Sequence, residues 1–315
     1  MAVFDMNQTC SVVPSTVQTD AGVAGAGTLL SFIITNSISL LLSAIIVLLG
    51  LRKSTSAPIC RKLLLSFSDQ QIITGIGIQS IGLAKMKTMV PYHFFIIWLL
   101  SLQSTATNLA TLVALVNDFK RDWVLRWLRQ FFMLLNMFLG VLSGIFILQT
   151  VTKNLEPRLP IACVWTVDGR GTASNAALSI AGTIAVIACQ VVVFVVATWY
   201  LHNRTEPKWL KSVQVCGLLI LLALGTGATI RVIMVSQAFG TVPEDVNLVG
   251  PSEKEWSYGQ LLPLLLLALP LINLVEIMRG EIRMTESKVD QDGMKEGLLG
   301  DTELNYQPKS RWRGR

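Results

Sequence analysis

Seven segments of the sequence are each roughly twenty residues long and almost free of charged side chains. A helix needs about 20 consecutive apolar residues to cross the hydrocarbon core of a bilayer. Only 15% of the residues are charged, whereas ordinary soluble domains carry about 25%. A transmembrane β-barrel would instead require segments of about ten residues that alternate in polarity. We therefore predict an all-α fold: a polytopic membrane protein with a bundle of seven transmembrane helices. The predicted spans are 29–51, 63–84, 93–116, 131–151, 175–199, 213–235 and 260–278.

Positive charge is distributed unevenly between the two sides of this bundle. Most of the 26 Lys and Arg residues fall in the loops after the first, third and fifth spans and in 279–315, whereas 1–28 contains none. Because cytosolic loops carry the excess of Lys and Arg, we predict that the N-terminus is outside or lumenal and the C-terminus cytosolic. The chain then has three regions: a lumenal or extracellular N-terminal segment, 1–28; a seven-helix transmembrane domain, 29–278; and a disordered cytosolic tail, 279–315.

Two features of the lumenal side bear on its chemistry. Asn7 begins an Asn-Gln-Thr glycosylation sequon, which is used only if this end is lumenal or extracellular; the alternative is a chance match. Of the five cysteines, Cys10 and Cys163 are the two expected on this side. The lumen is oxidising enough for a disulfide between them, and the sequence leaves open whether they pair.

The most polar stretch inside a predicted span is Ser-Phe-Ser-Asp-Gln-Gln at 66–71. Carboxylates and amides are costly in lipid and normally face a bundle interior or a cavity. Antiparallel packing of the second and third spans would place Asn108 at the depth of Asp69, and Glu276 in the seventh span would lie at the same level. We predict that Asp69, Glu276 and Asn108 form a catalytic site, because a carboxyl group in such surroundings can stay protonated and donate its proton. The alternative is that the carboxylates lie near the headgroups, pair with Lys or Arg and connect helices.

Other polar and aromatic residues of the spans have two interpretations each. Gln70 and Gln71 widen the polar face. Together with Trp98 they are the predicted substrate-binding residues, because amides and an indole ring can stabilise a positive charge that forms on a substrate. Arg231 is the one cation inside a predicted span; it either binds an anionic group or extends to the membrane interface. His93 opens the third span beside Tyr92, which is typical of an interfacial aromatic belt.

Several classes of function are disfavoured. The chain has no nucleotide-binding loop, no HExxH, no GxSxG and no aspartate-rich DDxxD motif. His93 and His202 are its only histidines and lack metal-ligand spacing, so we predict neither a metal nor a cofactor. The net charge of +6 is explained by membrane topology, so no nucleic-acid partner is predicted. The sequence does not specify an oligomeric state.

A resemblance adds to this interpretation. The run Ser68-Asp69-Gln70-Gln71, followed by Thr74-Gly75, Tyr92-His93 and Leu109-Ala110-Thr111-Leu112, resembles a family of fungal integral membrane proteins associated with secondary-metabolite clusters. The size, the span number and the lack of metal motifs also resemble the membrane-bound terpene cyclases of fungal meroterpenoid pathways, of the ascochlorin and macrophorin type. Those cyclases are taken to protonate an epoxide or a terminal olefin of a farnesyl chain attached to an aromatic or polyketide head.

The resemblance implies a membrane-embedded terpene cyclase that acts on a hydrophobic, prenylated small molecule dissolved in the bilayer. Asp69 would then be the acid, with Glu276 as the second candidate. The alternative is a seven-span receptor-like, scaffold or transport-related membrane protein without catalysis, although the Asp-Arg-Tyr motif of rhodopsin-like receptors and an internal repeat are both missing. We expect a glycoprotein that is integral to the endoplasmic reticulum, another endomembrane or the plasma membrane.

Overall fold

The computed structural model describes residues 10–52, 58–121, 123–171, 176–202, 210–241, 246, 248–250, 252–276 and 278–279. The chain forms two compact units, Met1–Pro270 and Leu271–Arg315. The described part of the second unit, 271–276 and 278–279, is helical. All contacts given below lie within the first unit.

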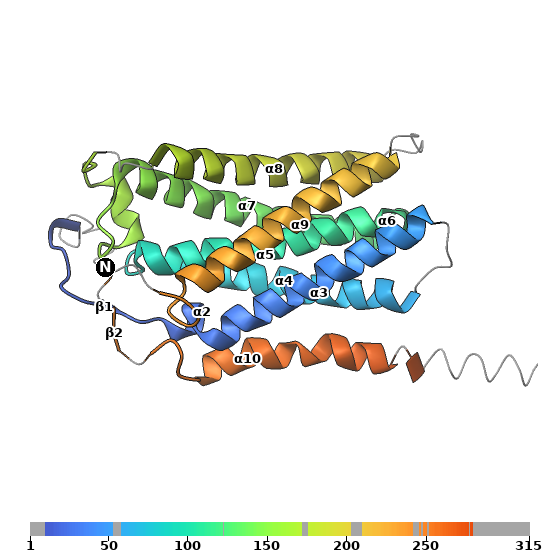
Figure 1. Cartoon of the computed structure of the whole chain (residues 1–315), viewed down its shortest axis with the longest axis horizontal. Coiled ribbons are helices and arrows are strands. Elements are labelled where there is room, and N and C mark those ends of the chain that lie inside the picture. The colour runs from blue at the N-terminus through green and yellow to red at the C-terminus, as the bar shows by residue number, and fades with distance from the viewer. Residues whose placement is uncertain are drawn as a thin grey trace, which may run out of the picture. The chain divides into compact units, whose positions relative to one another are not determined.

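The first unit is all-α apart from one short strand pair (Figure 1). Its long helices are α3 (Ala26–Leu51), α4 (Pro58–Ala84), α5 (Pro91–Ala114), α7 (Trp123–Lys153), α8 (Ala176–His202) and α9 (Leu210–Val235). Its shorter elements are α2 (Ala21–Ala24), α6 (Val116–Arg121), the 3-10 helix η1 (Ile161–Trp165) and α10 (Tyr258–Leu266). Strand β1 (Val17–Gln18) pairs in parallel with β2 (Leu248–Val249).

The described residues contain six helices that are long and apolar enough to cross a membrane, so the predicted class of integral, all-α membrane protein is confirmed. They are Ala21–Leu51, Pro91–Ala114, Arg126–Lys153, Ala176–His202, Lys211–Val235 and Tyr258–Glu276. The predicted second span corresponds to α4, which is long enough at 27 residues but is not one of the six. Its Asp69 and several Gln residues lower its hydropathy, so a count of seven spans remains a prediction.

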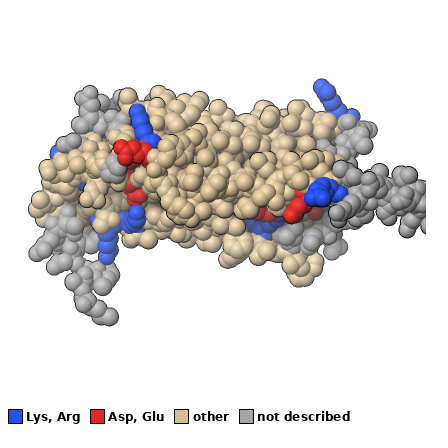
Figure 2. Space-filling view, turned by 90° about the horizontal axis from the view of Figure 1, so that it is seen from below, with Lys and Arg blue, Asp and Glu red and all other residues tan. Residues whose placement is uncertain are grey.

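Helix α5 is the centre of the bundle. Nearly all of its residues are buried, because α3, α4, α7, α8 and α9 all pack against it. On the outer helices, large apolar side chains such as Phe138, Val195 and Leu219 are more than half exposed. In Figure 2, Lys, Arg, Asp and Glu gather at the two ends of the helices and leave an uncharged band between them. This distribution is typical of a bundle whose outer surface faces lipid.

Polar side chains join α5 to its neighbours across the buried interfaces. The pairs are Ser68 with Asn108 (3.1 Å), Asn36 with Thr107 (3.2 Å), Thr105 with Asn136 (3.2 Å) and Gln103 with Thr229 (3.2 Å). Hydrogen bonds of this kind between membrane helices contribute about 0.6 kcal/mol each on average. Many polar residues of the predicted spans therefore have a structural role in helix packing.

The segments before α3, between α7 and α8, and between α9 and α10 meet at one end of the bundle, which we call the cap end (Figure 1). Here a disulfide joins Cys10 to Cys163, with a Cα–Cα distance of 5.5 Å. The Lys153 ammonium at the end of α7 donates hydrogen bonds to the carbonyl oxygens of Val164 (2.8 Å) and Val167 (3.3 Å). These contacts give the cap end a defined structure.

Candidate functional site

Asp69 forms an ion pair with Arg129, which joins α4 to α7. The Asp69 side chain is 48% exposed, whereas that of Arg129 is 11% exposed. The guanidinium also lies over the Phe119 ring, 5.5 Å from its centroid. This arrangement corresponds to the helix-connecting alternative for Asp69.

Asn108 meets a different residue of the polar stretch. Its Oδ1 accepts a hydrogen bond from the Ser68 hydroxyl (3.1 Å). Successive helical residues point about 100° apart, so Ser68 faces α5 while Asp69 turns toward α7. Asn108 Nδ2, Gln70 Oε1 and Gln71 Nε2 are buried and have no hydrogen-bond partner among the described residues. Asp69 therefore lies on a different face of α4 from the one that contacts Asn108 of α5.

The other predicted site residues lie apart from Asp69 and Asn108, outside the first unit or outside the described residues. Glu276 belongs to the second unit, so its meeting with Asp69 stays a prediction. Asn7 lies outside the described residues. Cys10 and Cys163 form the disulfide given above, and Trp98 lines a cavity described below. Within the described residues, no group of three or more His, Cys, Asp or Glu side chains could hold a metal ion.

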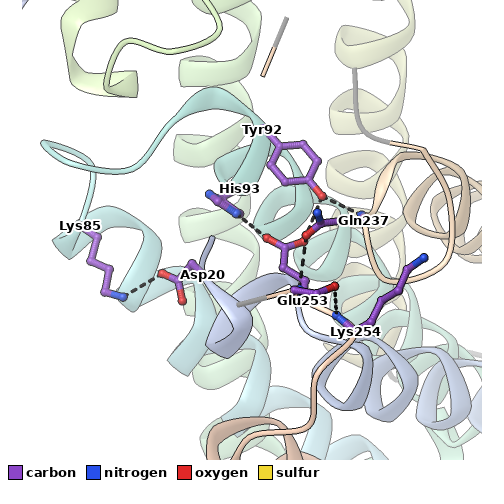
Figure 3. A network of polar contacts seen from close by, with 8 residues as sticks. Asp20, Lys85, Tyr92, His93, Gln237, Glu253 and Lys254 are labelled. Atoms are coloured by element: carbon purple, nitrogen blue, oxygen red, sulfur yellow. Dashed lines mark hydrogen bonds and ion pairs between the residues drawn. The ribbon is translucent and has the colours of Figure 1, made fainter. Parts of the chain in front are cut away.

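A buried acid–base cluster, which the sequence did not reveal, lies at the cap end. The Glu253 side chain is 0% exposed and that of His93 is 3% exposed, and Glu253 Oε1 lies 2.7 Å from His93 Nε2. The Tyr92 hydroxyl donates to Glu253 Oε2 (3.2 Å) and accepts from the backbone N–H of Gln237 (2.8 Å). Figure 3 shows His93 and Tyr92 converging on the Glu253 carboxylate, with Gln237 beside them.

The backbone around Glu253 is tied to the same elements. Its N–H donates to Gln237 Oε1 (3.3 Å), and its carbonyl accepts from the N–H of Ala26 at the start of α3 (3.3 Å). A buried carboxylate is costly unless it is paired and hydrogen-bonded, and here the cluster supplies both. Glu253 therefore connects the segment before α10 to α5, to the end of α9 and to α3.

A polar cavity of about 470 Å³ lies beside this cluster, with His93 in its wall. Asp20, Lys85 and Arg158 also line it, and Lys85 forms an ion pair with Asp20 (2.9 Å). A histidine held by a buried carboxylate beside a polar cavity has the parts needed for proton transfer or for binding a small polar molecule.

Sequence reasoning interpreted His93 as part of an aromatic belt and Glu253 only as part of an acidic loop. The available signal was weak: a Tyr-His pair at the start of a span, and acidic residues in a loop more than 150 positions away. His93 and Glu253 meet only because that loop folds onto α5, and composition and periodicity do not predict how a loop folds.

Two cavities lie along the seam between α8 and α9, which we call the α8–α9 crevice, with α5 as its floor. The wider one, about 520 Å³, is lined by Phe95, Trp98, Leu99, Leu102, Leu178, Ser179, Gly182, Thr183, Val186, Ala223, Leu224, Gly227, Ala228 and Arg231. The other, about 330 Å³ and almost wholly apolar, includes Val113, Val192, Tyr200 and Gln214 in its lining. Leu178 and Val192 at the rim are 81% and 59% exposed, so both cavities reach the outer surface of the bundle.

Comparison with known proteins supplies no relative: no family model matches the chain, and no curated protein and no solved structure matches it significantly. The resemblance to fungal membrane proteins therefore depends on the motifs quoted above, and the resemblance to terpene cyclases depends on size, span number and the lack of metal motifs.

Proposed function

We propose that this integral membrane protein binds a lipid-soluble amphiphile and holds its apolar chain in the α8–α9 crevice. The observation that carries the proposal is the crevice itself: about 520 Å³ and 330 Å³ of mostly apolar space against the central helix, with exposed side chains at its rim. Ligand sites are typically apolar cavities of about 300–1,000 Å³ with a few polar groups. A chain already dissolved in the bilayer would reach such a site laterally.

The packing of the bundle supports entry at this seam. Helix α8 packs on α7, α5 and α6, whereas α9 packs mainly on α5 and α3. In Figure 1, α9 runs obliquely to α8 and approaches it at the end where α8 finishes and α9 begins. The two helices make few contacts with each other, which leaves the seam between them poorly filled.

The second candidate is the reaction that the resemblance implies, cyclisation of a prenylated intermediate by protonation of an epoxide or olefin. Trp98 favours it, because its indole lies in the wall of the wider cavity, where a ring face can stabilise a carbocation. Asp69 remains the proposed acid and Glu276 the second candidate. Asp69 is not among the residues that line the two cavities, so this reaction requires that the substrate head reach beyond them.

The membrane arrangement is part of the proposal. We propose that α4 also crosses the membrane, which brings the number of spans to seven, with the N-terminus lumenal and the C-terminus cytosolic, in an endomembrane or the plasma membrane. Two observations support α4 as a span: it packs beside α3, α5 and α7, and its outer face exposes Ile73 (72%) and Ile81 (46%). Glycosylation at Asn7, removed by Asn7→Gln, together with a protease-accessible C-terminal tag on sealed microsomes, would support it; an unglycosylated N-terminus with a protected tag would contradict it.

Binding is tested by photocrosslinking a diazirine-bearing farnesol to the full-length protein in microsomes. Gly182 and Gly227 line the wider cavity, and a Cβ at either position would meet nothing within 4 Å. Leucine at these positions should therefore fill the crevice without disturbing the fold and should reduce crosslinking at least several-fold. Gly77→Leu is the matched control, since Gly77 is exposed on α4, also has free space for a Cβ and does not line the crevice. Equal crosslinking in all four proteins would refute the site.

Activity is tested by incubating the same microsomes with a farnesylated epoxide and a farnesylated olefin and analysing the extracts for cyclised product. Product that disappears in Trp98→Ala and in one of Asp69→Asn or Glu276→Gln would support the cyclase. Binding without product would favour the non-catalytic alternative, a receptor-like or transport-related protein.

A further inference from the structure

Arg231 occupies an unusual position in the bundle. It lies on α9, one turn before the helix ends at Val235, and is the only Lys or Arg between Lys211 and Lys254. Arg231 is exposed at the surface of the bundle, and no hydrogen bond or ion pair joins it to any residue that the structure describes. A cation in a membrane-spanning helix is costly and normally has a partner.

The surroundings of Arg231 indicate what that partner would be. Arg231 is the single charged residue in the lining of the wider cavity, whose other members are apolar apart from Ser179, Thr183 and the Trp98 indole. The Thr183 hydroxyl is engaged with the Ser179 carbonyl oxygen (2.9 Å). No acidic side chain lines this cavity. The site therefore combines one positive charge with an apolar trough and supplies no anion of its own.

We propose that Arg231 binds the anionic head group, a carboxylate or phosphate, of an amphiphile whose apolar chain lies in the α8–α9 crevice. This inference deepens the proposed binding function and depends on it. A guanidinium presents a planar fork of donors that fits the two oxygens of a carboxylate or phosphate, and hydrogen bonds to charged groups are the stronger ones. The head group would lie at the cap end of the crevice, and the chain would extend along α5 toward the α6 end.

The competing explanation is that Arg231 only extends to the membrane interface and interacts with bulk lipid headgroups. The two explanations differ in a measurable way. A head-group site discriminates between an acid and an alcohol with the same chain, whereas an interfacial arginine does not. The two explanations also make different predictions for Arg231→Lys, a variant that keeps the positive charge but loses the planar fork of donors.

The experiment measures binding of three probes to the purified full-length protein in nanodiscs of neutral lipid: farnesoic acid, farnesol and inorganic phosphate. The wild type should bind the acid about tenfold more tightly than the alcohol, which corresponds to roughly 1.4 kcal/mol. Inorganic phosphate should bind at least tenfold more weakly than the acid, because it lacks the chain. Arg231→Gln should reduce acid affinity to that of the alcohol and leave alcohol affinity within about twofold, and Arg231→Lys should fall between.

Lys211→Gln is the matched control, since it removes one positive charge from the other end of the same helix. Unchanged farnesol binding in each variant shows that the fold is intact. Equal affinity for acid and alcohol in the wild type, or an acid affinity that is unchanged in Arg231→Gln, would overturn the role of Arg231 while the crevice remained a chain-binding site. Equal loss of both ligands in an Arg231→Gln protein that unfolds at the wild-type temperature would overturn it as well. Failure of the wild type to bind any probe that carries a chain would overturn the proposed function and this inference with it.

Discussion

The cluster of Glu253, His93 and Tyr92 makes the sharpest prediction for stability. The Glu253 side chain is 0% exposed, and its two oxygens contact different partners, His93 Nε2 at 2.7 Å and the Tyr92 hydroxyl at 3.2 Å. Glu253→Ala removes both acceptors and leaves two buried polar groups facing a small void. Glu253→Gln keeps the shape and one acceptor oxygen but loses the charge.

The expected magnitudes follow from this geometry. Removal of one partner from a buried pair costs about 3–5 kcal/mol, because the other group is left uncompensated. We expect Glu253→Ala to fall in this range. Loss of a single hydrogen bond to a charged group costs about 1.5–3 kcal/mol, so Glu253→Gln should be milder. Since domains are typically stable by about 5–15 kcal/mol, the alanine variant should lower expression and thermal stability clearly.

The measurement is equilibrium unfolding of the full-length protein in mixed micelles, carried out as a double-mutant cycle with His93→Ala. Direct contact between the two side chains predicts a coupling energy of about 1–3 kcal/mol. Glu255→Gln is the matched control, because Glu255 lies two residues further along the same turn and is exposed; it should change stability by less than about 0.5 kcal/mol. A coupling energy near zero, or an equal effect of Glu253→Gln and Glu255→Gln, would refute the reasoning.

Three further predictions concern the bundle and its cap end. Cys163→Ser removes a disulfide that closes a loop with a sequence separation of 153. The substitution should lower the free energy of unfolding by about 2–5 kcal/mol. It should also abolish the mobility shift that reduction causes in a denaturing gel. Gly75→Leu should destabilise the fold by more than about 2 kcal/mol, since a Cβ there would collide with a side chain of α5. Gly77→Leu should leave the stability unchanged, because a Cβ there has free space. Thermal unfolding of the two variants checks this prediction. Asp69→Asn should cost about 1 kcal/mol or less, as expected of an ion pair whose carboxylate is half-exposed. Arg129→Gln should add little further loss in the double variant, and independent, additive effects would contradict the pair.

The helical architecture could be predicted because it depends on local properties. Length and hydropathy identify spans residue by residue, and the six apolar spans of the structure match predicted segments. The one exception is instructive, because α4 is long enough to span but carries polar side chains on more than one face. Hydropathy averages around the helix, so it cannot tell a polar face buried in protein from one exposed to lipid.

The site residues were harder to predict because they depend on helix rotation and on loop folding. Asp69 and Ser68 are adjacent in sequence, yet one pairs with Arg129 and the other with Asn108. Depth in the membrane can be estimated from the sequence, but the direction of a side chain around the helix axis is set by tertiary packing. Glu253 shows the same limitation for loops, since nothing local distinguishes it from an exposed acidic residue.

These observations change which polar residues of the bundle are candidates for ligand binding. Most hydroxyl and amide groups of α5 donate to or accept from a neighbouring helix, and such groups are explained by packing alone. Arg231 is different, because it lines a cavity at the exposed side of the bundle and forms no hydrogen bond or ion pair with any described residue. Trp98 shares that cavity, whereas Asp69 already has Arg129 as its partner. An intramembrane polar group indicates a ligand when the fold leaves it unsatisfied beside open space, and by this criterion the α8–α9 crevice is a better candidate for ligand binding than the Asp-Gln-Gln stretch of α4.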